Sequence, residues 1–201
     1  MNNSSAFSRR QFYQASFAQH GESPKSLQWK DYRSAAVRYR QLVVDLNVSG
    51  KTILDAGCGM GDLLPYLYGR GDDFTYLGVD NTPEFIEVAR KHYAGHEFNV
   101  ADPFAAEVSG RFDIVISSGF MNTSTTGWLE QRKAMIRRLF DYANETLVFN
   151  MAGGIQPTYE AGNIGYANVF EIAEFCASLT PKIAVRNQYH PKDFTMLLSK
   201  S

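Results

Sequence analysis

The stretch that decides the fold of this chain is Ile53-Leu54-Asp55-Ala56-Gly57-Cys58-Gly59-Met60-Gly61. A short apolar run ends in an acid and opens into three glycines at alternate positions. This pattern is typical of a buried strand that turns toward a helix while its backbone lies against a bound nucleoside. Glycine is needed there because a Cβ would block either the ligand or the dihedral angles of the turn. We therefore predict that Gly57, Gly59 and Gly61 line a nucleoside site.

Strands and helices are expected to alternate from Lys51 onward. The expected strands cover residues 52–55, 74–80, 97–100, 112–117, 146–150, 183–189 and 194–199. Only the four residues 190–193 separate the last two strands, which is short enough for an antiparallel hairpin. Such alternation predicts an α/β domain over residues 51–201, with a mainly parallel sheet and helices on both faces.

The first 50 residues are expected to form a helical N-terminal lid or extension. Between Asp31 and Leu46, apolar residues recur in steps of four and three, which predicts an amphipathic helix. A second element that could move is the long loop expected at Ala152–Ala167. It holds four glycines, and we expect it to act as a lid.

Composition restricts the classes of partner. The chain has 201 residues and a formal net charge of −1, without the basic surplus usual in proteins that grip nucleic acid by its phosphates. Two cysteines make no disulfide framework. Neither a secretory signal nor an apolar run long enough to cross a membrane is visible. We expect a cytoplasmic protein with a small-molecule partner, and the sequence leaves its oligomeric state open.

The acids at the ends of the expected strands are the next candidates. In open α/β sheets, ligands bind beyond the carboxyl ends of the strands. Asp80 ends the second strand and can accept both ribose hydroxyls of a nucleoside, with Asn81 packing beside the sugar or the base. Asp102 follows the third strand and can accept from an adenine amine, while the Ala101 amide donates to the ring. The alternative is that both acids only cap the helices that follow them.

Two further charged residues are candidates for the same site. Asp55 ends the first strand inside an apolar run, so its carboxylate must meet donors. We expect those donors to be amides of the glycine turn or a water bound to the ligand. Arg38 could present its guanidinium to a ligand carboxylate from the N-terminal helix, or it could lie on a solvated helix face.

Together these residues resemble class I S-adenosylmethionine (SAM)-dependent methyltransferases. The resemblance rests on the glycine stretch, Asp80, Asp102 and Phe112-Asp113-Ile114-Val115-Ile116-Ser117, and it covers about residues 51–201. It implies a Rossmann-like sheet of order 3-2-1-4-5-7-6 with an antiparallel last strand. It also implies SAM as cofactor, S-adenosylhomocysteine (SAH) as product, and Ser117 near the adenine or methionine moiety. His20-Gly21-Glu22-Ser23-Pro24 with Trp29 resembles a poorly characterised bacterial branch of this family.

The methyl acceptor is not written in the sequence. The fourth strand ends in Ser117-Ser118-Gly119-Phe120, whereas families that methylate adenine or glutamine carry Asn/Asp-Pro-Pro-Tyr there. No cysteine and histidine spacing suggests a metal site, and no catalytic base can be named. The expected acceptor is a small molecule, and the candidate pocket residues are Trp29, Met121, Asn122, Asn150, Tyr159 and Tyr166.

Two alternatives remain open. A nicotinamide-dependent oxidoreductase also combines a glycine loop with a ribose-binding acid, but its third glycine would fall at the position of Asp62. The other alternative is a catalytically silent SAM-binding or scaffolding protein, because a fold does not guarantee its chemistry.

Overall fold

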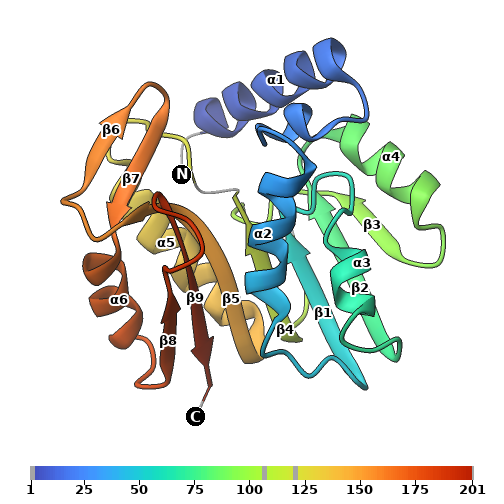
Figure 1. The fold of residues 1–201 in the computed structure, drawn as a ribbon. Helices are drawn as coiled ribbons and strands as arrows, with labels where there is room; N and C mark the ends of the chain where they lie inside the picture. Colours follow the sequence, from blue (N-terminus) through green and yellow to red (C-terminus); the bar gives the residue numbers. More distant parts are fainter. Residues whose placement is uncertain (1–2, 106–107, 120–121, 201) are drawn as a thin grey trace. The chain divides into compact units, whose positions relative to one another are not determined.

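The computed structural model describes residues 3–105, 108–119 and 122–200, and side chains from residue 9 onward. The chain consists of two compact units, Met1–Ser109 and Gly110–Ser201. Figure 1 shows the course of the chain through both units. Among the described residues, no helix is long and apolar enough to cross a membrane.

The sheet of the first unit is parallel and has the order β3-β2-β1. It is formed by β1 (Lys51–Ala56), β2 (Phe74–Asp80) and β3 (Glu97–Val100). β1 is buried from Ile53 to Ala56, as its apolar run predicts. The connecting helices are α3 (Leu64–Tyr68) and α4 (Pro83–His92). Because the strands are parallel, the glycine turn and Asp80 leave the sheet at the same edge.

Three helical elements precede this sheet: α1 (Asn3–His20), the 3₁₀ turn η1 (Pro24–Leu27) and α2 (Tyr32–Val43). Asp31 caps α2, since its side chain accepts the Ser34 N–H at 2.7 Å. The predicted apolar stripe is buried at Tyr39 and Val43 but not at Tyr32, which is 70% exposed. The helix predicted to start at Asp31 is therefore confirmed, although it ends at Val43.

The second unit has the strand order β4-β5-β9-β8. β4 (Phe112–Ser118) runs parallel to β5 (Ala143–Gly154), whereas β9 (Asp193–Ser199) pairs antiparallel with both β5 and β8 (Ile183–Arg186). β8 and β9 are the sixth and seventh strands of the prediction. The predicted order is thus confirmed in each unit, as 3-2-1 and as 4-5-7-6. Helices α5 (Trp128–Tyr142) and α6 (Val169–Ala177) complete this unit.

The long loop expected at Ala152–Ala167 is instead a hairpin. Its strands are β6 (Tyr159–Ala161) and β7 (Ile164–Asn168), drawn in orange in Figure 1. β7 pairs in parallel with the end of β5, at Gly153 and Gly154. This extra pairing explains why β5 runs beyond the predicted strand at residues 146–150.

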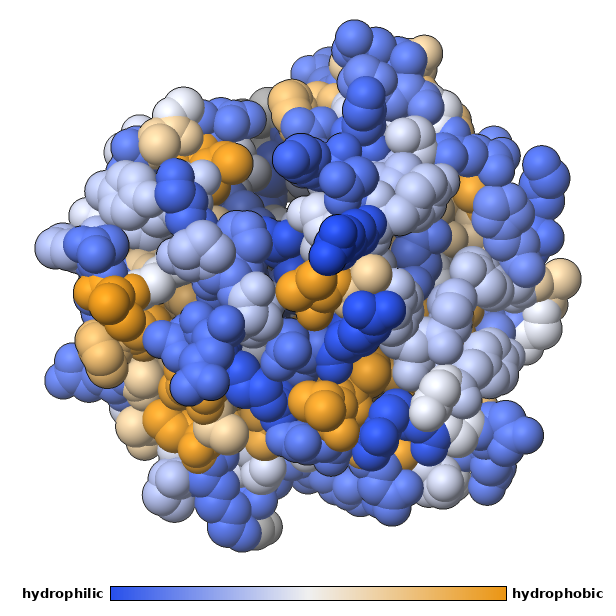
Figure 2. Space-filling model, in the orientation of Figure 1, coloured by the Kyte–Doolittle hydropathy of each residue, from blue (hydrophilic) through white to orange (hydrophobic). Residues whose placement is uncertain are grey.

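The surface drawn in Figure 2 is mostly hydrophilic, with hydrophobic residues in small groups. The large apolar side chains that are exposed stand apart along the sequence, and they include Tyr32, Ile155 and Phe170. Scattered apolar residues of this kind are normal on soluble domains. The surface composition therefore singles out no site, and the candidate site must be built from its polar groups.

Candidate functional site

The glycine turn after β1 has the backbone conformation that its sequence predicts. Gly57, Gly59 and Gly61 have φ values of 81°, 54° and 84°, in the left-handed region that side chains rarely adopt. The amides of Gly57 and Cys58 both donate to the Val79 carbonyl, at 2.8 and 3.0 Å. The turn is therefore fixed to the end of β2 by its own backbone.

Two of these glycines are also needed for close packing. A Cβ at Gly59 would lie 2.7 Å from Leu27 Cδ2, and a Cβ at Gly61 would lie 3.0 Å from the Tyr93 ring. At Gly59 the neighbour that excludes a side chain is thus a residue of η1. This contact could not be predicted, because Leu27 is one apolar residue in a segment without a clear period.

Asp80 lies directly against the glycine turn. Its Oδ2 accepts the Gly59 N–H at 3.1 Å, and its Oδ1 accepts the Thr82 N–H at 2.9 Å. The side chain is buried, and this burial raises the pKa of Asp80, while the bonds from Thr82 and Gly59 act in the opposite direction. Asp80 therefore performs the local turn-capping role, and it also joins the ends of β1 and β2.

Asp55 finds a donor that the sequence reasoning missed. The Tyr76 hydroxyl donates to Asp55 Oδ2 at 2.8 Å, a donor that was not among those predicted. Burial raises the pKa of Asp55 to about 7, the Tyr76 bond lowers it, and the nearby charges of Asp80 and Asp62 raise it further. The signal was available, because Tyr76 in β2 is two register positions from Gly78, the partner of Asp55 in β1, and therefore lies on the same face of the sheet.

Around β3, the structure gives the predicted adenine-binding groups local partners. The Ala101 N–H donates to the Asp80 carbonyl at 3.1 Å, so this amide has an acceptor other than the expected one. Asp102 Oδ1 accepts the Phe104 N–H at 2.9 Å, which is the capping alternative, although a turn follows it and not a helix. Asn81 Oδ1 accepts from the Thr82 hydroxyl at 3.4 Å.

The N-terminal helices bring aromatic residues to the same unit. Tyr13 and Phe17 of α1 pack with Leu27 on a buried cluster of Met60, Phe85 and Val88. Burial raises the pKa of Tyr13 to about 12, and the charge of Asp80 raises it further, so its hydroxyl lies within electrostatic range of that carboxylate. The apolar face at Tyr13 and Phe17 could have been found from sequence, but its proximity to Asp80 could not.

Arg38 and Trp29 contact each other. The Arg38 guanidinium lies 5.0 Å from the centre of the Trp29 ring, and its Nη1 donates to the Ser34 carbonyl and hydroxyl at 2.9 Å. Arg38 is buried, not on the solvated helix face that was the alternative. Arg38 was predicted to bind the cofactor and Trp29 to line the substrate pocket. The structure brings the two side chains into contact.

The remaining predicted residues belong to the second unit. Ser117 is buried near the end of β4, and Asn150 Oδ1 accepts the Gly119 N–H at 2.8 Å. Asn122 Oδ1 accepts the Ala152 N–H at 2.8 Å. Both asparagines thus fix the segment after β4 to β5. Met121 lies outside the described residues.

Tyr159 and Tyr166 face each other across the hairpin. Their rings are stacked with centroids 4.8 Å apart and planes 9° from parallel, and the Lys192 ammonium lies 5.6 Å from the Tyr166 ring centre. Tyr159 remains exposed. The predicted pair is therefore brought together on one face of β6 and β7.

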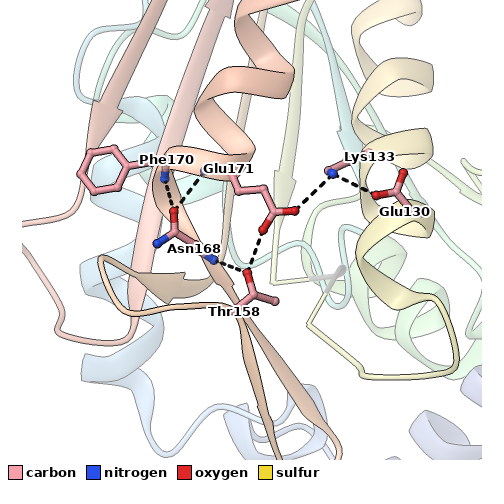
Figure 3. Close-up of polar contacts among 6 residues, drawn as sticks. All are labelled: Glu130, Lys133, Thr158, Asn168, Phe170 and Glu171. Atoms are coloured by element: carbon pink, nitrogen blue, oxygen red, sulfur yellow. Dashed lines mark hydrogen bonds and ion pairs between the residues drawn. The ribbon is translucent and has the colours of Figure 1, made fainter.

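A polar network holds the base of the hairpin to both helices (Figure 3). Thr158 donates to Glu171 Oε2 at 2.9 Å, and its hydroxyl accepts the Asn168 N–H at 3.0 Å. Lys133 of α5 then bridges Glu171 and Glu130, at 3.3 and 2.9 Å. Among the described residues, no group of three or more histidine, cysteine, aspartate or glutamate side chains is placed to hold a metal ion.

Comparison with known proteins finds similarity to methyltransferases. A family described as a methyltransferase domain matches residues 47–145, which include Gly57, Asp80 and Asp102. A protein of Mycobacterium tuberculosis named as a candidate methyltransferase is 27% identical over 156 residues, covering 75% of this chain and 93% of its own. The chain spans 26% to 42% of the length of further methyltransferase relatives.

Solved structures show the same fold. DhpI in complex with SAH aligns with a TM-score of 0.68 over 96% of this chain and 95% of its own, at 16% identity. The magnesium protoporphyrin IX methyltransferase of Synechocystis with bound SAH aligns with a TM-score of 0.63 over 81% and 80%, at 18% identity. The predicted Rossmann-like fold is confirmed. The match to the methyltransferase model across the glycine turn, Asp80 and Asp102, the methyltransferase relatives and the shared fold together support a class I SAM-dependent methyltransferase.

Proposed function

We propose that this chain binds SAM at the edge of the β3-β2-β1 sheet and transfers its methyl group to a small molecule, releasing SAH. The observation that carries the proposal is the bond from the Gly59 N–H to Asp80 Oδ2. It brings a turn of left-handed glycines and a buried carboxylate together at the carboxyl ends of two parallel strands. Nucleosides bind at this edge in open α/β sheets.

The residues present fit this cofactor. Asp80 accepts the backbone N–H groups of Gly59 and Thr82 and a bond from the Thr82 side chain, whereas an ionised carboxylate has about four acceptor sites, so capacity remains for a ribose hydroxyl. Asn81 is placed beside the sugar and Asp102 next to the base in our assignment. The adenine contact once expected of the Ala101 amide is not part of it, since that amide donates to Asp80.

We assign the methionine end of SAM to Arg38 and Asp55 of the first unit, and Ser117 of the second unit keeps the role that the family resemblance implies. Arg38 retains a buried positive charge suited to a carboxylate, and Trp29 holds its guanidinium in place. Asp55 acts from beneath the glycine turn, where Tyr76 fixes its orientation. When bound, SAM supplies a methyl group made electrophilic by its sulfonium. The protein's task is then alignment of donor and acceptor and exclusion of water.

The N-terminal segment, residues 1–50, serves in this proposal as a lid on the methyltransferase domain of residues 51–201. Its support is the contact of Leu27 with the glycine turn and of Tyr13 and Phe17 with the Met60, Phe85 and Val88 cluster. Gln14 reinforces it by donating to Glu84 at 2.9 Å, and Glu22 pairs with His92 at 3.0 Å.

A small-molecule acceptor is favoured by the formal net charge of −1, which lacks the surplus that nucleic-acid binding needs. The solved relative from Synechocystis is named for such an acceptor, magnesium protoporphyrin IX. We assign the acceptor side of the site to Asn122, Asn150, Tyr159 and Tyr166 in the second unit.

Calorimetric titration with SAH, and separately with NADH, tests the cofactor assignment. We expect saturable SAH binding and none of NADH. Binding of NADH without SAH would instead support the oxidoreductase alternative. Incubation with methyl-labelled SAM and pools of small metabolites then tests transfer, and label that stays on SAM throughout would favour the silent binding protein.

A further inference from the structure

Arg132 is a buried cation with unused hydrogen-bond donors. It lies on α5, one helical turn after Trp128, and its side chain is only 2% exposed. Its Nη2 donates to the Gly165 carbonyl at 2.8 Å. Its Nε and Nη1 are buried and have no acceptor among the described residues. The one N–H of Nε and the two of Nη1 therefore have no acceptor oxygen among the described residues.

This arrangement is unfavourable for a purely structural residue. A buried charge without a partner destabilises the folded state, and apolar side chains of similar size usually replace such groups without loss. Burial lowers the pKa of Arg132 to about 9, so the side chain is still charged at neutral pH. The guanidinium lies 4.1 Å from the centre of the Trp128 ring, a contact that does not use its in-plane donors.

The acids nearby are engaged elsewhere. Glu160 Oε1 accepts the Trp128 indole N–H at 2.7 Å. Glu130 and Glu171 are bridged by Lys133, the residue next to Arg132, at 2.9 and 3.3 Å. Lys133, which is paired with acids, and Arg132, which has unused donors, are thus consecutive residues of α5. Of the two, only Arg132 is buried.

Arg132 also lies near the carboxyl end of β4, the edge of the second unit to which we assign the acceptor. Gly165, whose carbonyl it contacts, donates its own N–H to the Asn122 carbonyl at 3.0 Å. Asn122 follows the carboxyl end of β4, and its side chain binds Ala152 near the end of β5. Lys192 beside Tyr166 adds a second cation to this region of the unit.

We infer that Arg132 is the anchor for a carboxylate on the methyl acceptor, so that the acceptor is a small carboxylic acid. The inference rests on the proposed function for the role of this edge. A carboxylate would supply the charge and the oxygen atoms that the guanidinium lacks, through the planar pairing that arginine favours. Trp128 covers one face of the guanidinium, and Gly165 of β7 packs directly against the Trp128 ring.

Benzoate and its uncharged analogue benzamide test this site in the full chain. In ¹⁵N-labelled protein we expect benzoate, and not benzamide, to shift the Arg132 Nε–H resonance in a saturable way. Arg132→Met should lower benzoate affinity by about tenfold or more, as expected for loss of hydrogen bonds to a charged group. Lys133→Met is the matched control, because it removes the adjacent but already paired cation, and it should leave benzoate affinity unchanged.

Benzoate that leaves the Arg132 resonance of the unmodified chain unshifted would overturn the inference, whatever the variants do. Unchanged benzoate affinity in Arg132→Met would overturn it too. A shift caused by inorganic phosphate and not by benzoate would overturn the carboxylate assignment. SAH titration of the same samples separates the two proposals: SAH binding without a benzoate site rejects only this inference, and an Arg132-dependent benzoate site without SAH binding rejects only the proposed cofactor.

Discussion

The Asp80 carboxylate accepts the N–H of Gly59 across 3.1 Å, so the acid at the end of β2 holds the middle of the glycine turn. A second bond, from Thr82, orients the other oxygen. Gly59 and Asp80 are 21 positions apart in the sequence. The parallel pairing of β1 with β2 is what brings them together, and the proposed cofactor site depends on that pairing.

Asp80→Ala should weaken SAH binding by about 2–4 kcal/mol, or roughly thirtyfold to a thousandfold, since hydrogen bonding to a charged acceptor is lost. Calorimetric titration measures this change directly. Asp72→Ala is the control, because Asp72 is an exposed acid just before the same strand. This variant should bind SAH with the affinity of the unmodified chain. Equal SAH affinity in the two variants would show that Asp80 only shapes the turn.

Asp55 should make the stability of the protein fall as the pH rises. Its pKa is raised from 3.8 to about 7 in the folded state, chiefly by burial. The unfolded chain therefore loses this proton first, and the free energy of unfolding falls between about pH 4 and pH 7 and then levels off. Asn at this position still accepts from Tyr76 but carries no charge.

Asp55→Asn should thus match the unmodified chain near pH 4 and exceed its unfolding free energy above pH 7, by up to ~4 kcal/mol at about 1.4 kcal/mol per pKa unit. Urea unfolding of both proteins at several pH values isolates the contribution of this one group. A stability difference that stays constant with pH would contradict the raised pKa.

Gly59→Ala should destabilise the chain for two separable reasons. The φ of 54° costs about 1–2 kcal/mol for a residue with a Cβ. The new Cβ would also lie 2.7 Å from Leu27 Cδ2. Adding Leu27→Ala to Gly59→Ala should remove the steric part and leave the backbone part, which a double-mutant cycle by urea unfolding resolves. Strict additivity of the two substitutions would show that Leu27 does not limit this position.

The sequence predicts most of what depends on local pattern. The glycine turn, every strand except β6 and β7, and the hairpin of β8 and β9 follow from apolar runs, glycines and short connections. The positions of Asp80 at the end of β2 and of Asp102 after β3 follow from the same alternation of strands and helices. Contacts between distant segments could not be predicted in this way. Tyr76 with Asp55 and Leu27 with Gly59 depend on strand register and on the packing of the N-terminal segment, which leave no periodic signal.

The hairpin illustrates the same limit. Four glycines in residues 152–167 suggested an irregular loop, yet three of them, Gly153, Gly154 and Gly165, lie in paired strands. Gly153 pairs with Ala167, and Gly165 lies against Trp128, where a Cβ would be 2.7 Å from the ring. Glycine thus marks close approach of neighbouring groups here as well as flexibility. The sequence analysis did not select Arg132 as a site residue for a related reason, since nothing in the sequence distinguishes it from Lys133 and Arg137 nearby.

Asn168 should anchor the hairpin through both ends of its amide, of which Figure 3 shows the oxygen end. Its Oδ1 caps α6 by accepting the Phe170 and Glu171 N–H groups, at 2.9 and 3.1 Å. Its Nδ2 donates to the carbonyls of Ile155 and Gln156, at 3.2 and 3.0 Å. Asn168→Ala loses both functions and should lower the free energy of unfolding by about 1–2 kcal/mol.

Asn168→Asp separates the two functions of that side chain, because it retains the cap and loses both donors. We expect it to recover most of the stability lost in Asn168→Ala. In hydrogen exchange, amides of β6 and β7 should nevertheless exchange faster than in the unmodified chain, because the segment before the hairpin is no longer tied to α6. Asn168→Asp with unaltered exchange in both strands would show that the Thr158 and Glu171 bonds suffice to hold the hairpin.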